Sequence, residues 1–255
     1  MVTLNSPQAP LLPISSEDHS IKSVVGLALP ETLADQKSEV SPRLISAVYP
    51  LVSGIILPTY FSRIEVSGQE NIPKTGPVIL APTHRSRWDA LIVPYAAGRY
   101  ATGRDLRYMV TVDEMQGLQG WFIRRMGGFA VNQKRLTTAT FRQSLNILQQ
   151  GETMVVFPEG NIFRGKQVHR LKPGLARLAL QAESIGDSTG VQIVPMAIQY
   201  EPAIPCMGSQ VRVRIGSSLQ VRDYCQGSVK RGAKNLTTDL GQSLQTLAQK
   251  AAFLR

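Results

Sequence analysis

A histidine and an aspartate stand five residues apart, at His84 and Asp89. They directly follow residues 77–81, a short apolar run that is typical of a strand. A histidine at a strand end and an aspartate in the first turn of the next helix can face one another. The aspartate can then accept a hydrogen bond from one imidazole nitrogen and leave the other free as a general base. The pair indicates proton-transfer chemistry, although Ser86 and Asp89 also match a capping box at a helix start.

Two further signals match chemical motifs whose structural context is missing. Residues 186–190 fit the nucleophile elbow G-x-S-x-G, but a helix is predicted before them and a strand after them, the reverse of the required order. Residues 160–167 nearly match a phosphate-binding P-loop, yet Gln167 stands where a hydroxyl would hold magnesium, and Pro173 limits the following helix. We therefore interpret both segments as loops and not as a hydrolase or NTPase site.

The composition predicts a globular protein that attracts anions. The chain has 255 residues, of which 43% are apolar and 18% charged, and its formal net charge is +10. These values exclude a disordered, collagen-like or disulfide-rich chain. Two separated cysteines, Cys206 and Cys225, with no cluster of Cys and His, predict a reducing compartment and no metal site. The positive charge favours partners that carry phosphate, whether nucleic acid, an anionic bilayer or a small substrate.

The first 63 residues are predicted to form two segments that differ from the rest. Residues 1–40 are rich in Pro, Ser and Gln, lack a secretory signal and are predicted to be a mobile tail. Residues 44–62 are uncharged, but prolines and a glycine interrupt them. We predict that residues 41–63 form one or two short membrane-docking helices at the bilayer interface. The alternatives are a buried core helix and a membrane span.

The remaining residues, 64–255, alternate between short apolar runs and helical patterns, which is typical of an α/β domain. Strands are predicted at residues 77–81, 107–112, 129–132, 153–157, 192–199 and 210–215. Helices are predicted at residues 86–97, 118–126, 138–150 and 174–184, and an apolar stripe indicates a last helix over residues 236–251. No repeat or linker divides this part of the chain, so we predict one domain.

Four more blocks follow the His-Asp pair in order, at residues 120–132, 157–160, 171–174 and 193–197. From about residue 60 to 220, this series resembles the 1-acyl-glycerol-3-phosphate acyltransferase family of phospholipid synthesis. The resemblance implies a mainly parallel central sheet flanked by helices, with an N-terminal membrane-docking element. It also implies that His84 is the general base and Asp89 its orienting partner, with no metal and no cofactor apart from the acyl donor.

The acceptor site is where the chain departs from this family. The resemblance implies that Glu159 and Gly160 belong to the acceptor-binding block, and we also expect Arg87 and Lys172 to bind substrate. Family members commonly carry Asn at the position of Thr83 and basic residues at three further positions, which here are Val112, Gln133 and Ile162. Because arginine and lysine reach far, we expect neighbouring cations to compensate for the missing basic residues: Lys134, Arg135 and Arg164.

These features predict a membrane-associated O-acyltransferase that faces the cytoplasm. It would transfer a fatty acyl group from acyl-CoA or acyl carrier protein to the free hydroxyl of 1-acyl-sn-glycerol-3-phosphate and form phosphatidic acid. One alternative is acylation of a different lysolipid or a polyol. A more remote alternative is a non-catalytic basic protein that binds a membrane or nucleic acid. Because aromatic and basic residues are not interleaved and no nucleic-acid motif occurs, we expect no nucleic-acid partner.

Overall fold

A mixed sheet of eight strands organises the computed structural model, which describes residues 40–131, 138–185 and 190–251. The strand order is β1-β7-β6-β2-β5-β3-β4, and β8 pairs with β6 outside this order. The strands are β1 (Phe61–Ser67), β2 (Val78–Pro82), β3 (Leu106–Thr111), β4 (Gly128–Val131), β5 (Thr153–Val155), β6 (Gln192–Glu201), β7 (Ser209–Ile215) and β8 (Leu219–Gln220).

The sheet is mainly parallel, as predicted. Strands β6, β2, β5, β3 and β4 pair in parallel, and so do β1 and β7. Among the described strands, only the pairs β6–β7 and β6–β8 are antiparallel. The carboxyl ends of neighbouring parallel strands meet at one edge, where open α/β sheets commonly bind ligands. The loops that follow β2 and β5 therefore lie beside each other.

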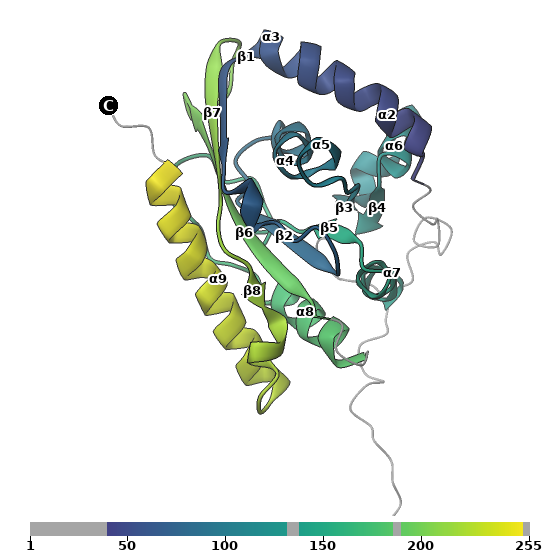
Figure 1. Ribbon diagram of the computed structural model, residues 1–255, viewed down its shortest axis with the longest axis vertical. Coiled ribbons are helices and arrows are strands. Elements are labelled where there is room, and N and C mark those ends of the chain that lie inside the picture. The colour runs from purple at the N-terminus through teal and green to yellow at the C-terminus, as the bar shows by residue number, and fades with distance from the viewer. Residues whose placement is uncertain (1–39, 132–137, 186–189, 252–255) are drawn as a thin grey trace, which may run out of the picture. The chain divides into compact units, whose positions relative to one another are not determined.

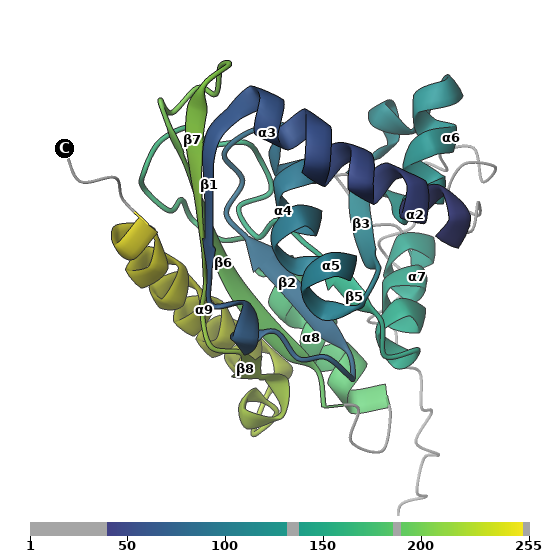
Figure 2. The same cartoon turned by 45° about the horizontal axis from the view of Figure 1, so that its top comes forward.

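Helices cover both faces of this sheet (Figures 1 and 2). One core cluster packs α4 against the sheet, with α5 beside α4, and the other packs α7, α8 and α9 against the opposite face. The helices are α2 (Pro42–Leu51), α3 (Leu57–Tyr60), α4 (Asp89–Ala97), α5 (Arg99–Thr102), α6 (Gly117–Arg125), α7 (Thr138–Gln149), α8 (Gly174–Ile185) and α9 (Val229–Ala251). Short turns add η2 (Val52–Ile56), η3 (Gln69–Asn71), η4 (Val112–Met115) and η5 (Val221–Tyr224).

Strand β2 is covered on both faces, which explains why its sequence is continuously apolar. Ile79 and Ala81 belong to the core cluster on the α8 and α9 face, while Val78 and Leu80 belong to the cluster on the α4 face. All four side chains are fully buried. A strand that is covered on both faces has no solvent side, so its sequence does not alternate between apolar and polar residues.

The predicted elements are present, with shifts at their ends. The helix predicted from residue 86 begins at Asp89, and the strand predicted over residues 153–157 ends at Val155. Strand β1 was not predicted, because its first residues were read as the end of the apolar segment. It pairs with β7, which lies far along the chain, so its formation depends on a contact that the local pattern does not contain.

The apolar N-terminal segment forms one helical run over residues 42–60, made of α2, the π-helical turn η2 and α3. Ser41 caps its first turn by accepting a hydrogen bond from the backbone N–H of Leu44 at 3.4 Å. The run has 19 residues and a mean hydropathy of 1.2, but only 17% of its most apolar window is buried. This exposure argues against the buried core helix that the sequence left open. Residues 61–63 belong to β1 and not to the helical run.

Candidate active site

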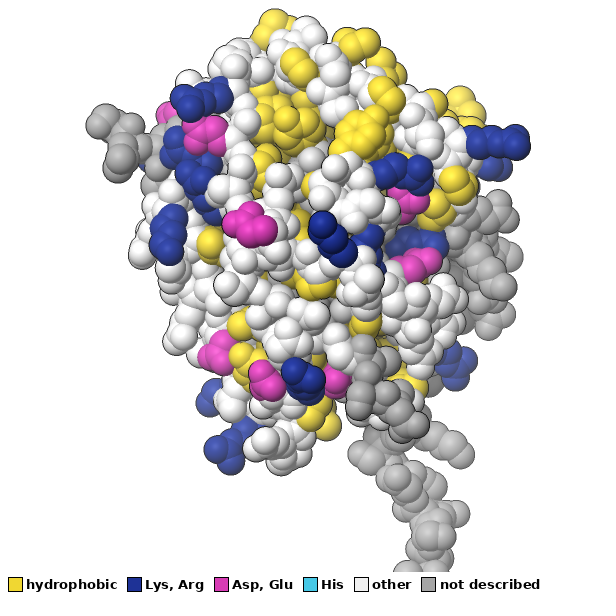
Figure 3. Space-filling view, in the orientation of Figure 1, with side chains coloured by type: hydrophobic (Ala, Val, Ile, Leu, Met, Phe, Trp, Pro, Cys, Tyr) yellow, Lys and Arg dark blue, Asp and Glu magenta, His cyan; other side chains and the backbone are white. Residues whose placement is uncertain are grey.

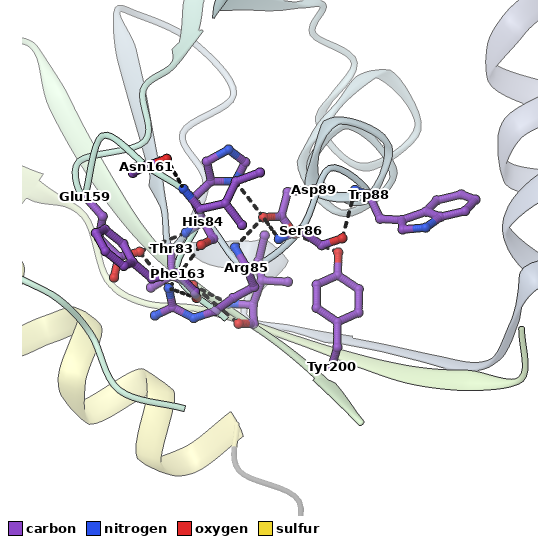
Figure 4. Close-up of polar contacts among 12 residues, drawn as sticks. Thr83, His84, Arg85, Ser86, Trp88, Asp89, Glu159, Asn161, Phe163 and Tyr200 are labelled. Carbon is purple, nitrogen blue, oxygen red and sulfur yellow. Dashed lines mark hydrogen bonds and ion pairs between the residues drawn. The ribbon is translucent and has the colours of Figure 1, made fainter. Parts of the chain in front are cut away.

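His84 and Asp89 meet at the carboxyl end of β2 (Figure 4). Imidazole Nδ1 lies 2.9 Å from Asp89 Oδ2. The strand places His84 two residues beyond its last member, and Asp89 is the first residue of α4, so the predicted strand-loop-helix geometry is present. The Asp89 side chain is fully buried, whereas 19% of the His84 side chain is exposed. The histidine can therefore meet a substrate while the aspartate stays inside the protein.

The Asp89 carboxylate is fixed by three further donors. Its Oδ2 accepts from the backbone N–H groups of Arg85 at 2.6 Å and Ser86 at 3.0 Å. Its Oδ1 accepts from the Tyr200 hydroxyl at 2.7 Å. Burial raises the pKa of the Tyr200 phenol well above its ordinary value, and the Asp89 carboxylate raises it further, so Tyr200 remains a protonated donor at neutral pH. A carboxylate held in this way can orient the His84 ring and keep the proton on Nδ1.

Two contacts hold the remainder of the histidine loop. The His84 ring stacks on Phe157, with 4.0 Å between the ring centroids and 22° between the planes. Phe157 follows β5, so the neighbouring parallel strand supplies the surface on which the imidazole rests. Before the histidine, the buried Thr83 hydroxyl accepts from the backbone N–H of Ile198 at 2.9 Å and ties the end of β2 to β6. Together these contacts restrict the imidazole to one orientation.

Glu159 lies beneath the loop that carries His84, in place of the acceptor contact that the family resemblance implied. Its Oε2 accepts from the His84 backbone N–H at 2.9 Å and pairs with Arg85 at 2.8 Å. Its Oε1 accepts from the His169 backbone N–H at 2.8 Å. The Glu159 side chain is fully buried and that of Arg85 is 2% exposed. Because both carboxylate oxygens already bond to protein groups, this geometry favours support of His84 over contact with a substrate.

A large cavity of about 980 Å³ extends from His84. This volume is at the upper end of the roughly 300–1,000 Å³ that is typical of small-molecule sites. Most of its lining is apolar and comes from the N-terminal helical run, α4, β3, α7 and α8. Its polar lining includes His84, Arg87, Gly160, Asn161 and Lys172. The carboxylates of Asp105, Asp113 and Glu114 also line it, and Glu114 pairs with Arg87. The cavity thus combines a long apolar interior with charged and polar groups, an arrangement that suits an amphiphile.

Apart from Glu159, the predicted acceptor residues divide into three groups. Arg87, Gly160 and Lys172 line the cavity, and Arg87 is mostly exposed and pairs with Glu114 at 2.8 Å. Arg164 is exposed and is not among the residues that line the cavity. Lys134 and Arg135 lie outside the described residues.

Glycine at position 160 is required by its backbone. Gly160 has a φ of +71°, a conformation that residues with a Cβ rarely adopt. A Cβ at this position would also lie 2.6 Å from Lys172 Cε. Gly160 therefore lets the loop after β5 turn closely against the lysine, and both line the cavity.

Tyr200 and Arg85 belong to the site but were missed from the sequence. Tyr200 lies 111 residues beyond Asp89 in the chain, and only the placement of β6 beside β2 brings them together. Arg85 was given no role in the sequence analysis, because buried arginines are rare. Nothing in the local pattern distinguishes either residue. In the described ranges, no group of three or more His, Cys, Asp or Glu side chains is arranged to hold a metal ion.

The fold and the site agree with a sequence family. A family model described as "Acyltransferase" matches residues 63–199, so the chain belongs to the acyltransferase family. The match includes the His84–Asp89 pair, the Glu159 loop and Lys172.

Two named relatives are similar to part of the chain. The chain is 27% identical over 153 residues to the "Probable 1-acyl-sn-glycerol-3-phosphate acyltransferase" of Mycoplasma pneumoniae. It is 28% identical over 142 residues to the "1-acyl-sn-glycerol-3-phosphate acyltransferase" of Borreliella burgdorferi. These matches cover 59% and 53% of this chain, and 54% and 51% of the relatives, so the chain spans about half the length of each relative that it matches.

A solved structure shares the fold. The crystal structure of the 1-acyl-sn-glycerophosphate (LPA) acyltransferase PlsC from Thermotoga maritima superposes with a TM-score of 0.65 and 19% sequence identity. The match covers 83% of this chain and 82% of that chain. It therefore extends beyond the residues of the family model and takes in most of the described sheet and helices.

Proposed function

We propose that the chain is an O-acyltransferase that transfers a fatty acyl group from a thioester donor to the free hydroxyl of 1-acyl-sn-glycerol-3-phosphate. The observation that carries this proposal is the His84–Asp89 pair at the polar edge of a large apolar cavity. The activity after which both relatives are named supports the same acceptor. The test is consumption of an acyl thioester on addition of the lysolipid, with appearance of phosphatidic acid.

In the proposed reaction, His84 acts as the general base. Its Nε2 takes the proton from the acceptor hydroxyl as that oxygen attacks the thioester carbonyl carbon. Asp89 stabilises the imidazolium that forms, and the tetrahedral intermediate then collapses with cleavage of the carbon–sulfur bond. The imidazolium returns its proton to the departing thiolate, so the base is regenerated. These steps need neither a metal nor a cofactor beyond the donor, and no covalent acyl-enzyme.

The proposed donor is acyl-CoA or acyl carrier protein, with its acyl chain in the apolar cavity and its thioester beside His84. Both donors are anionic, so the net charge of +10 favours either of them. Parallel assays with matched acyl chains on the two carriers would separate them. Use of neither carrier, in the presence of a vesicle-bound acceptor, would contradict the proposed donor class.

The proposed acceptor carries a phosphate, and the different lysolipid or polyol acceptor remains the alternative. Lys172 and Arg87 line the cavity near His84, which supports an anionic headgroup at this end. Charge-assisted hydrogen bonds contribute about 1.5–3 kcal/mol each. A competition assay with equal concentrations of lysophosphatidic acid and monoacylglycerol tests this assignment. Preferential use of the uncharged acceptor would leave acyl transfer intact but exclude the phosphate-bearing substrate.

Replacing Lys172 by glutamine is expected to raise the KM for lysophosphatidic acid about tenfold or more, because one charge-assisted contact is lost. The KM for the thioester donor should change little. Arg164→Gln is the matched control, since Arg164 is exposed eight residues earlier and does not line the cavity. Steady-state kinetics with each substrate varied in turn provide the measurement. If the KM for lysophosphatidic acid rose equally in both variants, Arg164 would also be assigned to the acceptor site.

The N-terminal helical run is proposed to hold the protein on a membrane. Leu51 and Ile55 are 48% and 60% exposed, while Ile45, Tyr49 and Leu57 are buried against the rest of the chain. Deleting the run would therefore expose core surface, and point variants are the sharper test. Leu51→Asp with Ile55→Asp is expected to move the protein into the soluble fraction, because charge replaces interfacial apolar area. Full retention on membranes would assign docking to other residues.

A further inference from the structure

Helix α6 presents large apolar side chains to solvent. Leu118 is 87% exposed, Trp121 is 47% exposed and Phe122 is 40% exposed. Their spacing of three and four residues places them on one face of the helix. Such a face normally points into the core, but the only fully buried residue of α6 is Gly120. A Cβ at Gly120 would lie 1.9 Å from Met115 O, so the face of α6 that carries Gly120 packs directly against the backbone at Met115. The large side chains lie on the other side of the helix and point to solvent.

The end of α6 lies beside the start of the N-terminal helical run. The backbone N–H of Ser41, which caps that run, donates to the carbonyl of Arg125 at the end of α6 at 3.0 Å. Both elements line the large cavity, the run through residues such as Val52 and Ile56, and α6 through Phe122 and Ile123. The exposed apolar residues of the run and of α6 thus flank the same cavity from two sides.

Positive charge accompanies the apolar residues. Arg124 and Arg125 form the last turn of α6, and the Arg125 guanidinium lies 4.8 Å from the centre of the Trp121 ring. The nearby Glu114 is engaged by Arg87 and Gln119. In the orientation of Figure 1, Figure 3 shows hydrophobic side chains at the top of the molecule, where α2 and α3 run, and basic side chains at its upper right. Tryptophan beside arginine is typical of a membrane–water interface.

We propose that α6 is a second membrane-contact element, which inserts Leu118, Trp121 and Phe122 into an anionic bilayer beside the N-terminal helical run. This inference rests on the proposed membrane-bound function. Because both elements line the cavity, contact of both with the bilayer brings lipid to the edge of the cavity. An amphiphilic acceptor can then reach His84 without crossing water. An acidic protein would also be attracted to the arginines, and the test below distinguishes it.

Trp121 offers a direct readout, because the chain has only two tryptophans. Trp88 packs against Tyr60 and Phe61, with ring centroids 4.1 Å and 5.2 Å away, so Trp88→Phe leaves Trp121 as the single reporter. On addition of vesicles of phosphatidylcholine and phosphatidylglycerol, we expect its emission to shift to shorter wavelength. Bromine on the lipid acyl chains should quench it. Vesicles of phosphatidylcholine alone should give a weaker response, since the arginines lose their anionic partners.

Vesicle sedimentation measures the contribution of α6 to binding. Leu118→Ser with Trp121→Ser is expected to weaken vesicle binding at least about tenfold, because burial of each large apolar side chain contributes to partitioning. Neither residue lines the cavity, so turnover of a soluble short-chain acceptor should stay unchanged. Val229→Ser is the matched control, since Val229 is 63% exposed on α9, and it should bind vesicles like the unaltered protein.

Three outcomes would overturn the inference. If the protein binds vesicles and the Leu51→Asp, Ile55→Asp variant weakens binding, but Trp121 emission is unchanged, the N-terminal run docks without α6. If neither the unaltered protein nor the Leu51→Asp, Ile55→Asp variant binds vesicles, the proposed membrane association fails as well. If Trp121 responds to acyl carrier protein and not to vesicles, the α6 face is a protein-docking surface. Persistent acyl transfer to a soluble acceptor in each case would leave the proposed chemistry standing.

Discussion

Replacing His84 by alanine is expected to lower the rate of acyl transfer by about 10² to 10⁴, the usual contribution of a general base. The change should appear in kcat, because the imidazole acts on the proton that moves during attack and not on binding of the acyl chain. The ring is partly exposed and its main packing contact is Phe157, so the fold should persist. Steady-state turnover of the thioester and a thermal unfolding curve provide the two measurements.

Asp89→Asn is the companion variant. It should retain part of the activity, because an imidazole is still present, although its tautomer and orientation are less well fixed. Its loss of stability should exceed that of His84→Ala, since the Asp89 carboxylate also accepts from two backbone N–H groups and from Tyr200. Turnover of purified, folded His84→Ala at the unaltered rate would refute the proposed mechanism.

Replacing Glu159 by alanine is expected to lower the free energy of unfolding by about 3–5 kcal/mol, because the buried Arg85 guanidinium loses its counter-charge. The Arg85 and Glu159 side chains are almost fully inaccessible to solvent, so water cannot replace the lost hydrogen bond and counter-charge. Activity should fall with stability, because the same carboxylate holds the backbone N–H of His84. Urea unfolding monitored by circular dichroism provides the measurement.

An exposed ion pair in the same chain is the control. Glu114 pairs with Arg87 at a similar distance of 2.8 Å, but the Arg87 side chain is 81% exposed. Glu114→Ala should therefore cost only about 0–1 kcal/mol. Arg85→Met combined with Glu159→Leu should recover much of the stability, since the pair is then replaced by apolar groups. A Glu159→Ala protein of normal stability and raised acceptor KM would instead restore the substrate-contact interpretation.

The sequence determined the class of fold because its signals are local. The alternation of apolar runs with helical patterns predicted strands and helices that the structure contains. Burial on both faces makes a strand such as β2 continuously apolar, and burial of one face gives a helix its apolar stripe. The loop between β2 and α4 was predicted with the correct geometry for the same reason, because only five residues separate His84 from Asp89. Order and spacing of the blocks then indicated the family to which the chain belongs.

Tertiary structure alone decided how that pair is supported and which cations lie near it. Tyr200 and Glu159 reach the His84 loop from β6 and from the loop after β5, through strand pairings that no local pattern encodes. Lys172 and Arg164 have the same charge and lie eight residues apart, yet only Lys172 lines the cavity. The type of a residue determines the chemistry that its side chain can perform. The residues that surround it in space are determined by contacts between distant segments of the chain. The sequence could therefore single out the His84–Asp89 pair, but not the contact by which the buried Glu159 carboxylate holds its loop.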